Sequence, residues 1–197
     1  MERKLFIFDV GGVVIYDTPI IEEFAEKYSL DFDEVFRDWK YYNKPLMDGY
    51  LDVGVFYRML EHKYGIDLSN DNIMVTCYHP KENRPLKKIV GMLREKGHRV
   101  VTGSNTFAPH WDYLKAMDPS PISGFDHLYA SHEIHFSKPE KAFFEYIIKS
   151  EGFDRKDTFF FDDVPANVDS AASVGLNAFH YRLNNDELLE YLKPYLG

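Results

Sequence analysis

Two nearly continuous apolar runs, each ending in an acidic residue, constrain the fold more than any other feature of the sequence. The run LFIF at residues 5–8 ends at Asp9, and the run TFFF at residues 158–161 ends at Asp162 and Asp163. Such runs are typical of strands that are buried on both faces, as in a parallel sheet covered by helices on each side. We therefore expect an α/β fold with acidic residues at one edge of a parallel sheet.

Further short apolar segments complete the expected sheet, and helical patterns separate them. The expected strands are 4–9, 98–103, 127–130, 158–162 and 177–181, and the expected helices are 80–97, 139–152, 168–174 and 186–196. This alternation predicts a Rossmann-like parallel sheet. Residues 17–80 instead show several amphipathic helical patterns in succession. We therefore predict an α/β core domain formed by 1–16 and 81–197, with an inserted all-helical cap domain at 17–80.

The composition limits the classes of partner. The chain of 197 residues has a net charge of −9, which argues against a nucleic-acid or membrane partner because both favour a basic surface. An anionic substrate would need local cations, from a metal ion or a lysine. The single cysteine, Cys77, excludes an internal disulfide and fits a reducing compartment, so we expect a cytoplasmic protein. The sequence leaves the oligomeric state open.

Four segments place polar groups where expected strands end or where a helix begins. They are FDVGGVV with Asp9, TGSNT with Ser104 and Asn105, SKPEKAFF with Lys138, and FFFDDVPANV with Asp162 and Asp163. Each segment alone has an ordinary structural explanation, as a turn, a helix N-cap or a solvated helix start. Because the carboxyl ends of parallel strands share one edge, the four segments together predict one site in which adjacent carboxylates require a cation.

In this order, the four motifs resemble those of the haloacid dehalogenase (HAD) superfamily, and the resemblance covers essentially the whole chain. It includes a helical cap between the first two motifs. The FDDVPANV form and the LREKGHRVVTGSNT context are most similar to the phosphatase branch that contains bacterial α-glucose-1-phosphatase-like proteins and the N-terminal phosphatase domain of epoxide hydrolases. The resemblance implies a HAD fold and a phosphoaspartyl mechanism.

Carried over to this sequence, the resemblance implies that Asp9 attacks phosphorus and forms a covalent aspartyl-phosphate. It implies a Mg²⁺ ion held by the Asp9 carboxylate, the Gly11 backbone carbonyl and Asp163. Asp162 is then a neighbouring acid, although the two adjacent acids could exchange roles. The residues that the resemblance assigns to the phosphate group are Ser104, Asn105 and Lys138, of which Lys138 also offsets the negative charge on the nucleophile.

Gly11 departs from the pattern of the superfamily. Most HAD phosphatases carry an aspartate two residues after the nucleophile, where it protonates the leaving group. Gly11 keeps only the backbone carbonyl, and general acid–base catalysis typically contributes about 10²–10⁴-fold. The departure suits a substrate whose leaving group departs readily, such as a sugar 1-phosphate. His110, His132 and His135 are alternative proton donors, although a surface or packing role is the simpler explanation for each.

The function expected from the resemblance is Mg²⁺-dependent hydrolysis of a small phosphorylated metabolite, with a sugar phosphate as the expected substrate. Two alternatives stay open. One is a metal-independent 2-haloacid dehalogenase, which needs no acid for a halide, although adjacent Asp162 and Asp163 argue against it. The other is a non-catalytic HAD-like protein that binds a phosphate ligand or a protein, which the joint presence of Asp9, Ser104 and Lys138 disfavours.

The segment 38–52 offers candidates for substrate specificity. It is rich in aromatic and polar residues and contains Pro45 and Gly49, so we expect a loop that reaches the mouth of the site. Its candidate contacts are Trp39, Tyr42, Asn43, Lys44 and Asp48, although packing between cap helices is the simpler role for most of them. After the second expected strand, the residues expected near the phosphate motif are Phe107, His110 and Trp111. We expect Cys77 to pack between helices.

Overall fold

The fold centres on a parallel sheet. The computed structural model describes residues 2–16 and 18–197, so the segment ends expected at residues 1 and 17 lie outside the described residues. Within the described residues, five parallel strands form the sheet in the order β5-β4-β1-β6-β7. They are β1 (Leu5–Phe8), β4 (Arg99–Ser104), β5 (His127–Ala130), β6 (Thr158–Asp162) and β7 (Asn177–His180). The predicted α/β class with a Rossmann-like parallel sheet is confirmed.

The central strand β1 determines where a site can form. It pairs with β4 on one side and β6 on the other, with Phe8 in register with Thr102 and Phe161. The chain runs from β1 to β4 and β5 on one side, and then crosses to β6 and β7 on the other. Ligands of open α/β sheets bind at such a switch point, beyond the carboxyl ends of the strands. Asp9 lies there, and its N–H donates to the Phe161 carbonyl at 2.9 Å.

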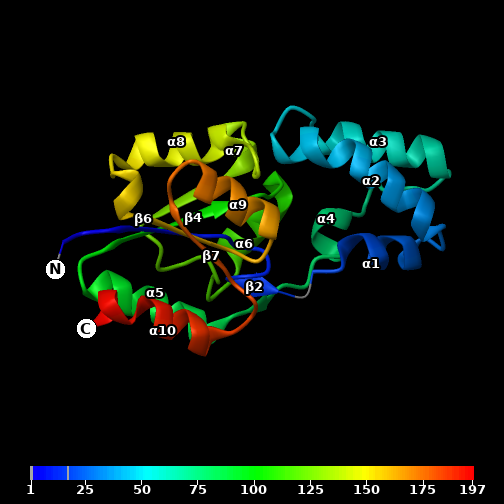
Figure 1. Cartoon of the computed structure of the whole chain (residues 1–197). Coiled ribbons are helices and arrows are strands. Elements are labelled where there is room, and N and C mark those ends of the chain that lie inside the picture. Colours follow the sequence, from blue (N-terminus) through cyan, green and yellow to red (C-terminus); the bar gives the residue numbers. More distant parts are fainter. Residues whose placement is uncertain (1, 17) are drawn as a thin grey trace.

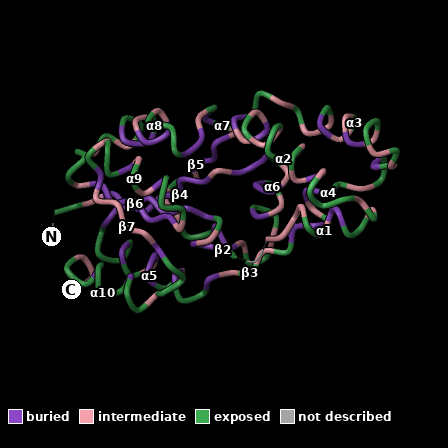
Figure 2. The backbone as a smooth tube through the Cα atoms, turned by 45° about the vertical axis from the view of Figure 1, so that its right-hand side comes forward, coloured by how far each residue is buried: buried purple, intermediate pink, exposed green. Residues whose placement is uncertain are grey.

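Helices cover both faces of the sheet (Figure 1). Successive residues of β1 alternate between the faces, so Phe6 and Phe8 enter one core while Leu5 and Ile7 enter the other. The three central strands, β1, β4 and β6, are almost entirely buried, whereas the outer strands β5 and β7 are only partly buried (Figure 2). The first face packs against α5 (Arg84–Glu95), α6 (Ala108–Ala116) and α10 (Asn185–Leu196), and the second against α7 (Ser131–Ile134), α8 (Lys141–Glu151) and α9 (Pro165–Ser173). A 3-10 turn, η1 (Arg155–Asp157), precedes β6.

The segment between β1 and α5 forms a helical unit with its own hydrophobic core. Its helices are α1 (Ile20–Lys27), α2 (Phe32–Met47), α3 (Val53–Tyr64) and α4 (Ile73–Thr76). Asp31 and Asp52 start α2 and α3, because their side chains accept hydrogen bonds from the first-turn N–H groups. Phe24, Val35, Phe56 and Leu60 are buried at the centre, and Cys77 is buried with them, in agreement with the expected packing role.

A two-stranded ribbon joins this helical unit to the sheet. β2 (Ile15–Tyr16) pairs antiparallel with β3 (Lys81–Glu82) at the two ends of the insertion. The ribbon was not expected, because two residues are too few to show a strand pattern. It also shortens the helix expected at 80–97, which begins only at Arg84. Asn83 caps that helix, as its side chain accepts from the Leu86 N–H at 3.4 Å.

The prediction of a loop at 38–52 is largely wrong, because most of this segment is helical. Helix α2 continues through Pro45 to Met47, and the turn occupies only the residues between α2 and α3. Pro45 lies in the last turn, so the missing proline N–H removes just one helical hydrogen bond before the helix ends. Trp39 lies inside the helix, where its ring packs against Phe56 and against Phe107 with centroids 6.1 and 5.1 Å apart. Helix α6 was also not expected.

Candidate active site

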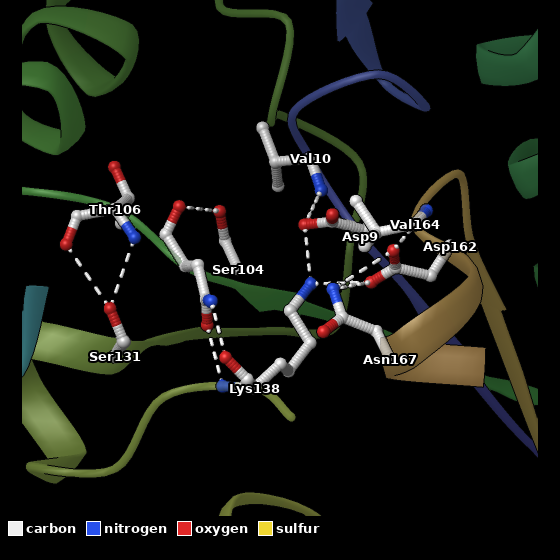
Figure 3. Close-up of polar contacts among 10 residues, drawn as sticks. Asp9, Val10, Ser104, Thr106, Ser131, Lys138, Asp162, Val164 and Asn167 are labelled. Atoms are coloured by element: carbon white, nitrogen blue, oxygen red, sulfur yellow. Dashed lines mark hydrogen bonds and ion pairs between the residues drawn. The ribbon is translucent and has the colours of Figure 1, made fainter. Parts of the chain in front are cut away.

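The four sequence segments meet beyond the carboxyl ends of β1, β4 and β6 (Figure 3). Asp9 follows β1 and is 7% exposed. Its Oδ1 accepts a hydrogen bond from the Val10 N–H at 2.6 Å. Burial raises the pKa of Asp9 well above its ordinary value, and attraction to Lys138 offsets only part of this effect. A cation near this carboxylate would favour its ionised form.

Lys138 provides the buried cation of the site. Its Nζ lies 2.8 Å from Asp9 Oδ1 and 2.7 Å from Asp162 Oδ2, and its side chain is fully buried. Burial alone would lower the pKa of Lys138, but attraction to the two carboxylates outweighs burial and raises it. The lysine is therefore charged and fixed between the two acids. A buried ammonium in this geometry can offset negative charge at the Asp9 carboxylate.

The two adjacent acids at the carboxyl end of β6 have different environments. Asp162 is fully buried, and its Oδ1 accepts from the Val164 N–H at 2.8 Å. The Asn167 side-chain amide also donates to both Asp162 oxygens at 3.1 Å. Asp163 is half-buried, and burial followed by repulsion from Asp162 raises its pKa. Asp162 thus binds Lys138 and the start of α9, while Asp163 is the more exposed of the two acids.

Carboxylate oxygens of Asp9, Asp162 and Asp163 lie within 4.8 Å of one another, which fits a hard divalent cation such as Mg²⁺. Gly12 makes room for this arrangement. Its φ is +72°, and a Cβ atom at this position would lie 2.2 Å from Asp163 Oδ2. Only glycine satisfies both the backbone conformation and this close approach. The donor set and the space around Asp163 both fit the expected metal.

Ser104, the last residue of β4, and Asn105, which follows it, lie on the Lys138 side of the site (Figure 3). Ser104 is 2% exposed. The Asn105 side chain pairs with the backbone of Lys138: its Nδ2 donates to the carbonyl at 2.9 Å and its Oδ1 accepts from the N–H at 2.8 Å. The Asn105 carboxamide is therefore used to hold the Lys138 loop, which leaves its backbone N–H as the group that can meet a phosphate oxygen. The sequence motif gave no signal for this clamp.

A second pair of residues fixes the same segment to the start of α7, directly after β5. The Ser131 hydroxyl accepts from the Thr106 N–H at 3.0 Å and donates to the Thr106 carbonyl at 3.1 Å. At the other edge, His180 Nε2 lies 3.0 Å from the Asp163 carbonyl oxygen. Neither contact was expected, because both depend on residues that are distant in the sequence.

Gly11 lies at the exposed rim of the site. A Cβ atom built there would meet nothing within 4 Å, and its φ is outside the left-handed region. Among the described residues, no hydrogen bond or ion pair joins the three histidine candidates to Asp9 or Lys138. His110 instead stacks on Tyr78 with centroids 4.1 Å apart, and burial lowers its pKa to about 3. Burial also lowers the pKa of His132.

A buried carboxylate at the switch point of a parallel sheet, with a buried lysine against it, is an arrangement that can support hydrolysis through an acidic residue. Residues 3–175 match the family model described as haloacid dehalogenase-like hydrolase, so the chain belongs to this family. The expected resemblance to the HAD superfamily is confirmed.

Two curated relatives align over most of both chains. A sesquiterpene phosphatase of Aspergillus oryzae is 27% identical over 90% of this chain and 89% of its own length. The D-ribitol-5-phosphate phosphatase of Bacteroides thetaiotaomicron is 23% identical over 89% of this chain and 90% of its own.

Solved structures share the fold. A HAD family enzyme from Bacteroides thetaiotaomicron superposes with a TM-score of 0.83 at 24% identity, over 97% of this chain and 99% of that one. A magnesium complex of that enzyme gives a TM-score of 0.77 at 25% identity, over 92% and 94% of the two chains. Among the described residues of the present chain, no helix combines the length and apolar character that crossing a lipid bilayer requires.

Proposed function

We propose that this protein is a Mg²⁺-dependent phosphatase that acts on a small phosphorylated metabolite through an aspartyl-phosphate on Asp9. The observation that carries the proposal is the buried Lys138 ammonium, 2.8 Å from Asp9 and 2.7 Å from Asp162. The half-buried Asp163 lies close to both acids. A carboxylate that attacks a phosphate dianion meets like-charge repulsion, which such a cation offsets. The names of both curated relatives, and the magnesium complex of the structural relative, support the same reaction.

Each residue of the site has a separate role in the proposed phosphoryl transfer. Asp9 Oδ1 accepts from Val10 and Lys138, so we assign the attack on phosphorus to Oδ2. The new bond joins Oδ2 to phosphorus while the bond from phosphorus to the ester oxygen breaks, and the leaving oxygen takes a proton from solvent. Water then attacks the phosphorus of the aspartyl-phosphate, which releases inorganic phosphate and restores the carboxylate. The Ser104 hydroxyl and the Asn105 N–H bind phosphate oxygens, and Lys138 offsets their charge.

We assign Mg²⁺ to the Asp9 carboxylate, the Gly11 carbonyl and Asp163, and not to Asp162. The reason is that Asp162 already accepts hydrogen bonds on both oxygens from Lys138, Val164 and Asn167. When bound, the ion would supply further positive charge at the phosphate oxygens.

The absence of an acidic side chain at Gly11 favours one class of substrate. A site with no acid beside the leaving group favours esters whose oxygen departs as a stable anion. We therefore propose a sugar phosphate, with the phosphate on the anomeric carbon as the favoured form. The D-ribitol-5-phosphate phosphatase supports a polyol or sugar phosphate, whereas the sesquiterpene phosphatase makes an isoprenoid phosphate the class to test against it.

We also propose that the helical unit acts as a cap domain at 17–80 over a core of 1–16 and 81–197. The separate core of α1–α4 and the ribbon at both ends of the insertion support this division. A cytoplasmic location stays a prediction that rests on the single Cys77.

A substrate panel tests the proposal. Phosphate release is measured with and without Mg²⁺ from sugar 1-phosphates, sugar 6-phosphates and an isoprenyl monophosphate, and chloride release is measured from 2-chloropropionate. We expect phosphate release that a chelator abolishes, fastest with a 1-phosphate, and none from Asp9→Asn. Phosphate release that persists in a chelator would contradict the metal-dependent mechanism, and chloride release would support the dehalogenase alternative. If no substrate turns over and Asp9→Asn still binds inorganic phosphate, a non-catalytic binding protein is favoured.

A further inference from the structure

The helical unit touches the core at a second place, away from the β2–β3 ribbon. The turn between α2 and α3 lies beside α7 in Figure 1, whereas the ribbon joins the two parts near β2. At this second place, Lys44 of α2 reaches residues on both sides. Its Nζ lies 2.5 Å from Asp48 Oδ2, 2.7 Å from Glu140 Oε1 and 3.4 Å from Ser137 Oγ. We name these four residues, Lys44, Asp48, Ser137 and Glu140, the latch.

The turn beside the latch fits closely against the core. The Asp48 side chain is only 5% exposed, and the Asp48 carbonyl oxygen lies 2.9 Å from His135 Nδ1. Gly49 has φ +70°, and a Cβ atom there would lie 2.4 Å from the His132 carbonyl oxygen. The Tyr50 ring stacks on His135 with centroids 5.4 Å apart. Backbone and side-chain contacts therefore hold this turn against the core, and they hold the end of α2, which carries Lys44, with it.

The core side of the latch flanks the catalytic lysine proposed above. Ser137 precedes Lys138, and Glu140 follows two residues after it. The same loop is held from the core by the Asn105 clamp and by the Ser170 hydroxyl, which donates to the Pro139 carbonyl at 2.5 Å. From the helical unit, Lys44 contacts this loop through Glu140 and Ser137. The loop that carries Lys138 is thus held from both parts of the molecule.

We infer that Lys44 is a positioning residue, which ties the seating of the helical unit to the place of the Lys138 ammonium between Asp9 and Asp162. Through Glu140 and Ser137, it fixes the Lys138 loop when the α2–α3 turn is docked. The catalytic consequence rests on the proposed phosphatase function, whereas the mechanical link does not. Lys44 itself acts on the reaction only through the loop.

A double-mutant cycle tests the inference. The variants are Lys44→Met, Glu140→Gln and the double variant, with Lys44→Arg as the conservative replacement. Lys40→Met is the matched control, because Lys40 lies one turn earlier on α2 and its Nζ sits 4.3 Å from the Phe36 ring centroid. Each single variant is expected to lower kcat with 4-nitrophenyl phosphate by about fivefold, as partly exposed ion pairs contribute up to about 1 kcal/mol. KM should change little, and the double variant should be no slower than the slower single one.

Amide hydrogen exchange gives a readout that needs no turnover. Exchange at residues 137–141 should be faster in Lys44→Met than in the wild type, and unchanged in Lys44→Arg and Lys40→Met. Additive losses in kcat, an effect confined to KM, or unchanged exchange at 137–141 would each overturn the inference. If the wild type hydrolyses no phosphate ester, the proposed function fails, and the exchange measurement alone still decides whether Lys44 holds the loop.

Discussion

Replacing Gly11 by aspartate should add a proton donor two residues after the proposed nucleophile, Asp9. The position accepts a side chain, because a Cβ atom there meets nothing within 4 Å and the φ angle is not left-handed. Substitutions at such exposed positions usually change the free energy of unfolding by no more than about 0.5 kcal/mol. The new carboxyl group would join Asp9 and Asp163, whose negative charge favours its protonated form. A protonated acid at the rim can then give its proton to the leaving oxygen.

The size of the effect depends on the leaving group. General acid catalysis contributes about 10²–10⁴-fold, so we expect Gly11→Asp to raise kcat/KM for alkyl phosphates by roughly 10²-fold, the lower end, since the carboxyl is new to the site. For 4-nitrophenyl phosphate, whose leaving group needs no proton, kcat/KM should stay within about twofold of the wild type. Gly11→Asn has nearly the same shape without an acidic proton, and it should give no gain with either substrate.

The assay is a series of phosphate esters with leaving groups of increasing pKa, at saturating Mg²⁺. In the wild type, log kcat/KM should fall steeply as the pKa of the leaving group rises, and in Gly11→Asp the slope should be shallower. A wild-type slope that is already shallow would mean that a proton donor exists elsewhere, and the reasoning from Gly11 would be refuted. An equal gain from Gly11→Asn would refute it as well.

Three further substitutions test other parts of the structure. Gly12→Ala puts a methyl group 2.2 Å from an Asp163 oxygen. The Mg²⁺ concentration for half-maximal activity should therefore rise by about tenfold or more, measured by metal titration. Lys138→Met removes the cation between two buried carboxylates, so urea unfolding should show a loss of about 3 kcal/mol and phosphatase activity should vanish. His110 has its pKa lowered by burial to about 3. Between pH 3 and about 6.5, His110 is protonated in the unfolded chain but neutral in the folded one, so the free energy of unfolding falls as the pH falls through this range. Above about pH 6.5 the imidazole is neutral in both states and this loss is absent. Compared with His110→Phe, the wild type should lose about 2 kcal/mol more between pH 7 and pH 5 in urea unfolding, and equal losses would contradict the buried neutral imidazole.

The strands of the sheet could be predicted because the signal for each one lies in a few consecutive residues. A strand buried on both faces needs an apolar run such as LFIF or TFFF, and the acid that ends it falls at the edge where ligands bind. The same edge brought Asp9, Lys138 and Asp162 together as the sequence indicated. The assignment of the metal to Asp163 instead of Asp162 stays a prediction, which the hydrogen bonds to Asp162 support.

The contacts that orient the site were not predictable, because they join residues that are far apart in the chain. Asn105 holds Lys138 across 33 residues, and Lys44 reaches Ser137 across 93. Helix α2 passes through Pro45, which local propensity disfavours. The helix ends within one turn of Pro45, and its Trp39 ring packs against Phe56 of α3 and against Phe107. No pattern in a single sequence records such long-range choices.

The β2–β3 ribbon has a consequence for how this protein can be altered. Ile15 faces Glu82 and Tyr16 faces Lys81, so the chain leaves the sheet domain and returns to it through neighbouring strands. Any polypeptide whose two ends lie about one strand spacing apart, about 4.8 Å, can in principle be joined at these positions. The ribbon is therefore a position at which a different insertion can be joined to the sheet domain. Such a graft would keep Asp9 and the Asn105 contacts of the Lys138 loop, and it would remove Lys44, which contacts the same loop from the helical unit.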